Sequence, residues 1–293
     1  MLLGLLLLTH HLANGTTVVL APDPAATRVA IHATFAVKEM NPALASHLEG
    51  WTVDANEQRA VLAIETDDAA RALRQLSDAL SRYTAPSTVI AIAGNVDERI
   101  LESINIPNGP PRARCITQST VPRIRVDRSD TDVSITYRTA VAPSADWFAL
   151  NILADILGQG DASRLQRALV ASGLATRFGE GMTESSCAPS LLRMRARLAP
   201  GVSADRVLAV IDREIERLQR ELVSDEELRI AHQQELQFAN DQLATPAAIA
   251  SAAARSALFY GDANRVTSDG ARMERVSAED VRRVARRYLT RPM

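Results

Sequence analysis

Three segments of the sequence carry histidines that could take part in metal chemistry. A catalytic zinc ion needs three protein ligands that converge on one point, with a fourth position open for water. His47–Gly50 (HLEG) and His232–Leu236 (HQQEL) each bring a histidine near a glutamate, but neither ends in the Glu-His of an H-x-x-E-H motif. The pair His10-His11 lies beside a leucine run. We therefore predict solvated or packed histidines, no metal or cofactor site, and no catalytic residues.

No other arrangement of reactive side chains matches a catalytic pattern. Ser185-Ser186-Cys187 has no histidine nearby in the sequence, and no G-x-S-x-G nucleophile motif occurs. The turn Gly158–Gly160 follows a helical pattern rather than a strand, and it lacks the third glycine of a dinucleotide-binding loop. Cys115 and Cys187 form no C-x-x-C pair, so metal or redox roles have little support, although one disulfide could form in an exported protein.

Composition limits the classes of protein to consider. The 293 residues suggest about two domains, and 46% hydrophobic with 23% charged residues is ordinary for a soluble globular protein. A net charge of -2 gives no basic surplus to attract nucleic acid. Lys38 is the only lysine among 33 basic residues, which indicates GC-rich codon usage in a bacterium. The apolar run Leu2–Leu8 is shorter than the roughly 20 residues of a membrane span, and it is either a buried strand or an export remnant. The compartment, bacterial cytoplasm or periplasm, therefore stays open.

The elements that would position a site are clearest in the segment Asn151–Phe178. An apolar helix face runs into the turn Gly158–Gly160, and a polar start, Asp161–Ser163, then opens a second helix. We predict that this helix ends at Gly173, because glycine accepts the left-handed C-cap conformation without steric cost.

A weak internal repeat organises much of the chain. Thr27–Val37 aligns with Thr131–Val141, and both alternate in the manner of half-buried strands. Further strands and amphipathic helices follow the same order in each copy: Thr16–Leu20, Ala60–Ile64 and Asp67–Leu80 in the first, and Ile124–Val126, Leu191–Leu198 and Ser203–Leu222 in the second. We predict an α+β fold of two related strand-and-helix domains, residues 1–110 and 118–293, of which the first is abbreviated.

Two details sharpen this prediction. Ser224–Glu227 and Ser277–Asp280 are typical of capping boxes, and Pro246 suits the first turn of a helix over 247–258. If the repeat is real, Val133 and Ile135 should face helices rather than water.

Four segments together resemble the insulinase family of zinc peptidases, which includes pitrilysin and the mitochondrial processing peptidase. They are the opening strand Leu12–Leu20, the strand Thr84–Val96, the segment Asn151–Phe178, which is similar to the family's "iLGgG.sSRL...L....gLA" pattern, and the closing helix Val276–Leu289. They occur in the family's order. The resemblance implies a duplicated sheet packed against helices.

The departures from the family concern its catalytic apparatus. In active members the H-x-x-E-H helix lies between strands like Ala30–Val37 and Ala60–Ile64, and a further glutamate ligand precedes the strand like Thr88–Ala93. Those intervals are short here and hold no such motif, so a large part of the expected first domain is missing. The family's substrate-holding Arg and Tyr correspond to Leu169 and Thr176, neither of which could replace them.

The resemblance therefore implies a catalytically inactive homologue, a non-catalytic subunit or partner in peptide or protein processing. It would bind a peptide or unfolded protein segment, with Gly158, Gly160, Ser163 and Arg164 lining the site, and Arg164→Glu should weaken that binding without unfolding the chain. A zinc-bearing homologous subunit, or a second copy, would pair with apolar surface left uncovered on the first domain. Two alternatives stay open: an active zinc metalloendopeptidase with unrecognised ligands, and a truncated, non-functional homologue. Neither a membrane span nor a nucleic-acid partner is expected.

Overall fold

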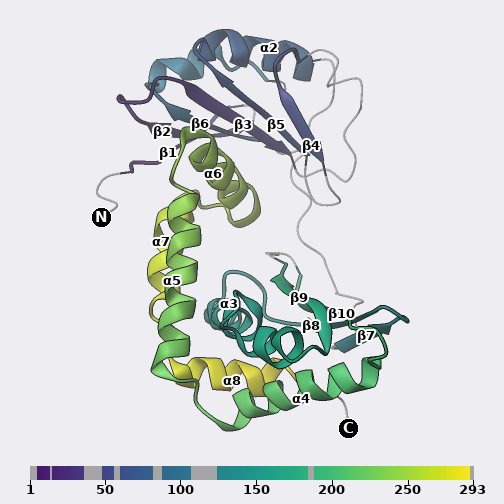
Figure 1. Cartoon of the computed structure of the whole chain (residues 1–293). Coiled ribbons are helices and arrows are strands. Elements are labelled where there is room, and N and C mark those ends of the chain that lie inside the picture. Colours follow the sequence, from purple (N-terminus) through teal and green to yellow (C-terminus); the bar gives the residue numbers. More distant parts are fainter. Residues whose placement is uncertain are drawn as a thin grey trace. The chain divides into compact units, whose positions relative to one another are not determined.

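The computed structural model divides into two compact units (Figure 1). The first comprises Met1–Arg114 with Phe238–Asp269, and the second comprises Cys115–Gln237 with Gly270–Met293. The structure describes residues 5–13, 15–35, 48–55, 60–81, 88–106, 124–183 and 188–290. No helix in these ranges is long and apolar enough to span a bilayer.

The first unit contains a six-stranded sheet with the strand order β1-β2-β6-β3-β5-β4. The strands are β1 (Leu8–His11), β2 (Thr17–Pro22), β3 (Val29–Phe35), β4 (Thr52–Ala55), β5 (Ala60–Thr66) and β6 (Thr88–Gly94). β2 and β6 run parallel, and the other neighbouring pairs are antiparallel. Gly94 closes β6 with a φ of +128°, and a Cβ there would lie 2.5 Å from the carbonyl oxygen of Arg28, so only glycine fits.

Helices cover both faces of this sheet (Figure 1). On one face, α2 (Ala69–Ser81) buries Leu73 in the same apolar cluster as Ile31. On the other face, α6 (Pro246–Tyr260) packs Ala253 into a cluster with Val19. Successive strand residues point to opposite faces, so both sets of side chains are buried. The 3₁₀ segment η1 (Glu98–Ser103) follows β6.

The first unit differs from the sequence-based expectation in two respects. The predicted ranges, 1–110 and 118–293, place the helix now seen as α6 in the second domain, whereas residues 238–269 belong to the first unit. The expected uncovered apolar surface is also not seen in the described part of this unit, because α6 occupies that face of the sheet. Its exposed large apolar side chains there are Leu6, Val53 and Phe238. Within the run Leu2–Leu8, residues 2–4 lie outside the described residues and Leu8 begins β1.

The second unit contains a four-stranded antiparallel sheet with the order β7-β8-β10-β9. The strands are β7 (Ile124–Arg128), β8 (Asp132–Arg138), β9 (Ala175–Met182) and β10 (Leu191–Leu198). The helical segments are α3 (Ala145–Gly158), η2 (Gln166–Ala171), α4 (Ala204–Arg220), α5 (Asp225–Asp241), α7 (Arg265–Met273) and α8 (Ala278–Tyr288). The division between the units falls within α5 and α7. Within the second unit, α8 packs against α3 and α4.

The predicted repeat corresponds to β3 and β8. Val29 and Ile31 are 6% and 0% exposed, and the matching Val133 and Ile135 are 1% and 0% exposed, so the repeated residues face the interior as predicted. β3 pairs antiparallel with β5, as β8 does with β10. One difference is that β6 lies between β2 and β3, whereas β7 pairs directly with β8. The predicted α+β class, with two sheets packed against helices, is confirmed.

The predicted helix starts are also confirmed. Ser224 and Glu227 bond reciprocally at the start of α5, because the Ser224 backbone N–H donates to the carboxylate and the Glu227 N–H donates to the Ser224 hydroxyl. Ser277 and Asp280 form the same capping box before α8. Pro246 lies in the first turn of α6, where its missing N–H leaves no hydrogen bond unmade.

Candidate functional site

The residues predicted to bind peptide lie at the turn that follows α3. Gly158 ends α3, and a Cβ there would lie 2.2 Å from Cγ of Glu180 and 2.9 Å from Cε1 of Phe178. Gly160 is exposed and has a φ of +76°. The first glycine is therefore required by packing and the second by backbone conformation. The following helical segment, η2, ends at Ala171, and Gly173, directly after the C-cap residue Ser172, has the predicted left-handed conformation with a φ of +74°.

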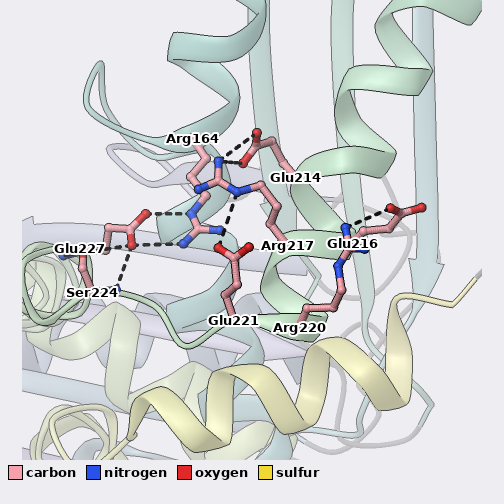
Figure 2. Close-up of polar contacts among 8 residues, drawn as sticks. All are labelled: Arg164, Glu214, Glu216, Arg217, Arg220, Glu221, Ser224 and Glu227. Atoms are coloured by element: carbon pink, nitrogen blue, oxygen red, sulfur yellow. Dashed lines mark hydrogen bonds and ion pairs between the residues drawn. The ribbon is translucent and has the colours of Figure 1, made fainter.

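Arg164 is held in a buried ion pair (Figure 2). Its side chain is 7% exposed, and its Nε and Nη2 atoms donate to the two carboxylate oxygens of Glu227 at 2.7 and 3.0 Å. The same carboxylate accepts hydrogen bonds from the backbone N–H and hydroxyl of Ser224 at 2.9 and 3.0 Å. Burial opposes ionisation of Glu227, but the bonds from Arg164 and Ser224 outweigh it and lower its pKa to about 2.

This pairing changes what is expected of Arg164→Glu. Because the guanidinium is buried against a carboxylate, the substitution would oppose two negative charges, and the expectation that the chain stays folded is replaced by a large loss of stability. Ser163, next to it, is 6% exposed, and its hydroxyl has no hydrogen-bond partner in the described part of the chain. A peptide-binding role for Gly158, Gly160, Ser163 and Arg164 stays a prediction.

The histidine segments do not assemble a metal site where the structure describes them. His232 lies on α5, and its Nε2 is 3.1 Å from the carbonyl oxygen of Val276, so this nitrogen is engaged in a hydrogen bond within the protein. His10 Nε2 lies 4.0 Å from Glu98 Oε1. His47 lies outside the described residues. Across the described ranges, no three His, Cys, Asp or Glu side chains are placed to hold a metal ion.

The remaining catalytic candidates are also accounted for. Leu169 is 0% exposed, so it belongs to the core. Thr176 is exposed on β9, where its hydroxyl donates to the carbonyl oxygen of Arg197 at 3.4 Å. Neither therefore substitutes for the Arg and Tyr of an active peptidase. The segment Ser185-Ser186-Cys187 and Cys115 lie outside the described residues.

A cluster of three carboxylates from α3, β9 and α5 was not predicted from the sequence. Burial, followed by the negative charges of Glu235 and Glu180, raises the pKa of Asp155 to about 9. The protonated Asp155 therefore donates a hydrogen bond to Glu235. Burial also raises the pKa of Glu180 and of Glu235. The three residues come from separate elements, so no local pattern in the sequence could have revealed the cluster.

We expect Asp155→Asn to stabilise the protein at alkaline pH. In the unfolded chain Asp155 loses its proton near its ordinary pKa of 3.8, whereas in the folded chain it keeps it up to about 9. The folded state therefore binds the extra proton over this window, and stability falls as pH rises through it. Removing the carboxyl should raise the free energy of unfolding at pH 8 by at least about 1.4 kcal/mol, the equivalent of one pKa unit.

Urea unfolding at pH 5 and pH 8 measures this effect, with Asp161→Asn in the exposed turn as the matched control. Asp155→Asn should flatten the pH dependence, and Asp161→Asn should leave it unchanged. If the free energy of unfolding of Asp155→Asn changed between pH 5 and pH 8 as much as that of the unaltered protein, a protonated Asp155 in the folded state would be contradicted.

A second feature that sequence analysis missed is an arginine-rich face of the second sheet. Along β10, Leu192, Met194 and Ala196 are buried, whereas the alternate Arg193, Arg195 and Arg197 are exposed. The neighbouring strand β9 adds Arg177, which pairs opposite Arg197. A cavity of about 590 Å³ lies over these strands. The alternation in the segment Leu191–Leu198, LLRMRARL, was a visible signal, but only the pairing of β9 with β10 completes the face.

Comparison with known families assigns the fold. The family model described as the peptidase M16 inactive domain matches residues 79–235, more than half of the chain. The chain belongs to the peptidase M16 family. This match confirms the resemblance to insulinase and pitrilysin-like peptidases, and it groups the chain with the catalytically inactive members. No curated protein matches the sequence significantly.

Solved structures agree with this M16 assignment. A protease from Helicobacter pylori is 14% identical, with a TM-score of 0.80 and coverage of 97% of both chains. The M16 inactive domain from Pseudomonas fluorescens is 16% identical, with a TM-score of 0.77 and coverage of 97% of this chain and 95% of that one. An inactive peptidase domain from Bordetella parapertussis is 28% identical, with a TM-score of 0.51, over 56% of this chain and 88% of that chain.

Proposed function

We propose that this M16 homologue is a non-catalytic subunit of a peptide- or protein-processing assembly, which pairs with a zinc-bearing relative and helps to hold the polypeptide. The observation that carries the proposal is the match to the inactive-domain model, in a chain without an H-x-x-E-H motif. A catalytically inactive chain that keeps the peptidase fold retains the architecture that binds polypeptides and partner subunits, although it has lost the metal chemistry.

Two structural relatives support a role in assemblies. A structure of complex III2 from Candida albicans contains a chain that is 15% identical, with a TM-score of 0.75 over 97% of this chain and 93% of that one. The ferredoxin protease FusC, solved as a mutant in complex with Arabidopsis ferredoxin, is 14% identical with a TM-score of 0.69. This chain covers 44% of that protease. In both structures the related chain belongs to a complex with other proteins, which favours a role for this chain in binding other proteins.

The test combines metal content with partner binding. We expect the purified protein to contain far less than one zinc ion per chain, and chelators to leave its melting temperature unchanged, because no zinc motif is present to couple metal binding to folding. Multi-angle light scattering with a zinc-bearing M16 relative from the same genome should show a complex at micromolar concentration, with higher peptidase activity than the relative alone.

The two alternatives give different results. Stoichiometric, tightly held zinc with peptidase activity in the isolated chain would favour an active metalloendopeptidase. A chain without zinc that stays a monomer, and leaves the activity of the relative unchanged, would favour a non-functional homologue.

A further inference from the structure

The arginine-rich face of the second sheet has a regular geometry. In the antiparallel pairing of β9 with β10, Arg177 lies opposite Arg197, Gly179 opposite Arg195, and Gly181 opposite Arg193. Directly paired residues project from the same side of a sheet, so these four arginines and two glycines share one face. We call this face the arginine trough. Along β10 its arginines recur at every second residue, so their Cα atoms are about 6.8 Å apart.

The charges of the trough are incompletely neutralised. Asp132 on β8 lies 3.2 Å from Arg195 and 3.9 Å from Arg197, and these arginines are still 66% and 62% exposed. Among the described residues, no ion pair involves Arg177 or Arg193, whereas Asp132 pairs with Arg195 and Arg197. Four arginines line the cavity with two acidic residues, Asp132 and Glu180, which leaves a positive surface on a protein whose net charge is -2. Core packing does not require these charges, because the apolar side chains of β10 lie on the other face.

The two glycines form an open floor in the trough. A Cβ at Gly179 or at Gly181 would meet no atom within 4 Å, and neither residue has a positive φ. Neither packing nor backbone conformation therefore demands glycine, although glycine weakens a strand interior through its conformational entropy. Glycine in a strand often marks the close approach of a ligand or another backbone. The cavity of about 590 Å³ lies over these residues.

We propose that the arginine trough binds an extended acidic polypeptide segment with carboxylates at every second position. In an extended chain such carboxylates recur at the same spacing as Arg193, Arg195 and Arg197. Each guanidinium can bind a carboxylate through two parallel N–H···O bonds. This inference rests on the proposed function and names the chemical class of the polypeptide that the subunit holds.

Nucleic acid fits the trough less well. Single-stranded nucleic acids are held by aromatic side chains on which the bases stack, together with basic groups along the backbone. The residues that line the cavity include no aromatic side chain. An acidic polypeptide needs no stacking platform, and its backbone could approach the glycines closely.

Fluorescence anisotropy with labelled repeat peptides tests the proposal. We expect the full-length protein to bind a Glu-Thr repeat peptide at least about tenfold more tightly than the Gln-Thr or Lys-Thr peptide of the same length, and binding should weaken with salt. Arg177→Gln with Arg193→Gln should abolish the preference, since these arginines form no ion pair that the fold needs. Gly179→Val should weaken binding by filling the floor, where the structure leaves room for the side chain.

The control is Arg220→Gln, which removes a 67% exposed arginine from α4 and should leave peptide binding unchanged. Equal binding of the three peptides, tighter binding of single-stranded DNA, or full binding by the Arg177 and Arg193 double variant would overturn the proposal. Complex formation with the zinc-bearing relative is measured separately, in the absence of peptide. If the protein forms the complex but binds the three peptides equally, only the proposed binding of acidic polypeptide in the trough is refuted. If it prefers the acidic peptide but forms no complex with the relative, only the proposed subunit role is refuted.

Discussion

Arg164→Glu is expected to destabilise the protein by about 3–5 kcal/mol, the usual cost of leaving a buried ion-pair partner uncompensated. Arg164 is 7% exposed and bonds to both oxygens of Glu227, so the variant would place two carboxylates together in a poorly hydrated site. The loss is a large fraction of the stability of an ordinary domain. Urea unfolding followed by circular dichroism measures it.

The pH dependence of this loss follows from Glu227. Its pKa is about 2 in the folded protein and 4.5 ordinarily, so its contribution to stability is present above pH 4.5 and is lost as pH falls from 4.5 towards 2. In Arg164→Glu this acid-dependent loss should disappear.

The matched control for this prediction is Arg220→Glu. Arg220 and its partner Glu216 are 67% and 61% exposed, and such surface pairs contribute about 0–1 kcal/mol (Figure 2). Similar losses in Arg164→Glu and Arg220→Glu would show that burial of the Arg164–Glu227 pair does not determine the stability difference.

Ile135→Asp should unfold the second unit. Ile135 is 0% exposed at the centre of β8, between its pairing partners Val126 on β7 and Met194 on β10. A charge there has no counter-ion, and an uncompensated buried charge costs several kcal/mol. Hydrogen–deuterium exchange should show the loss of amide protection in β7, β8 and β10.

The neighbouring Ser134→Asp is the control for Ile135→Asp, because Ser134 points to the other face of β8, opposite Arg195. A new carboxylate there lies outside the apolar core, opposite the Arg195 guanidinium on one side and Asp127 of β7 on the other, and protection should be retained. Retained protection in Ile135→Asp would contradict the burial of this strand.

The sequence by itself determined the local elements of this protein. The alternation in Thr131–Val141 and the caps at Ser224 and Ser277 predicted a strand and helix starts that the structure contains. These features depend on residues close in sequence, for which periodicity and capping chemistry are sufficient. The family was recognised for a similar reason, since short segments such as Asn151–Phe178 each resemble a family pattern and follow one another in the family's order.

Other features were decided only by the tertiary structure, because they depend on contacts between residues distant in sequence. The Ala-rich helix α6 follows all the elements of the second sheet in the chain, yet it covers the first sheet. The buried ion pair of Arg164 depends on Glu227 of α5, which is distant in sequence, and the predicted peptide-binding role of Arg164 stays a prediction. The raised pKa of Asp155 depends on its burial and on carboxylates brought to it by two other elements. The arginine trough needed the register of β9 on β10, which no local pattern encodes. Burial and charge pairing are properties of the assembled fold, and they decided which polar side chains serve stability and which remain available for binding.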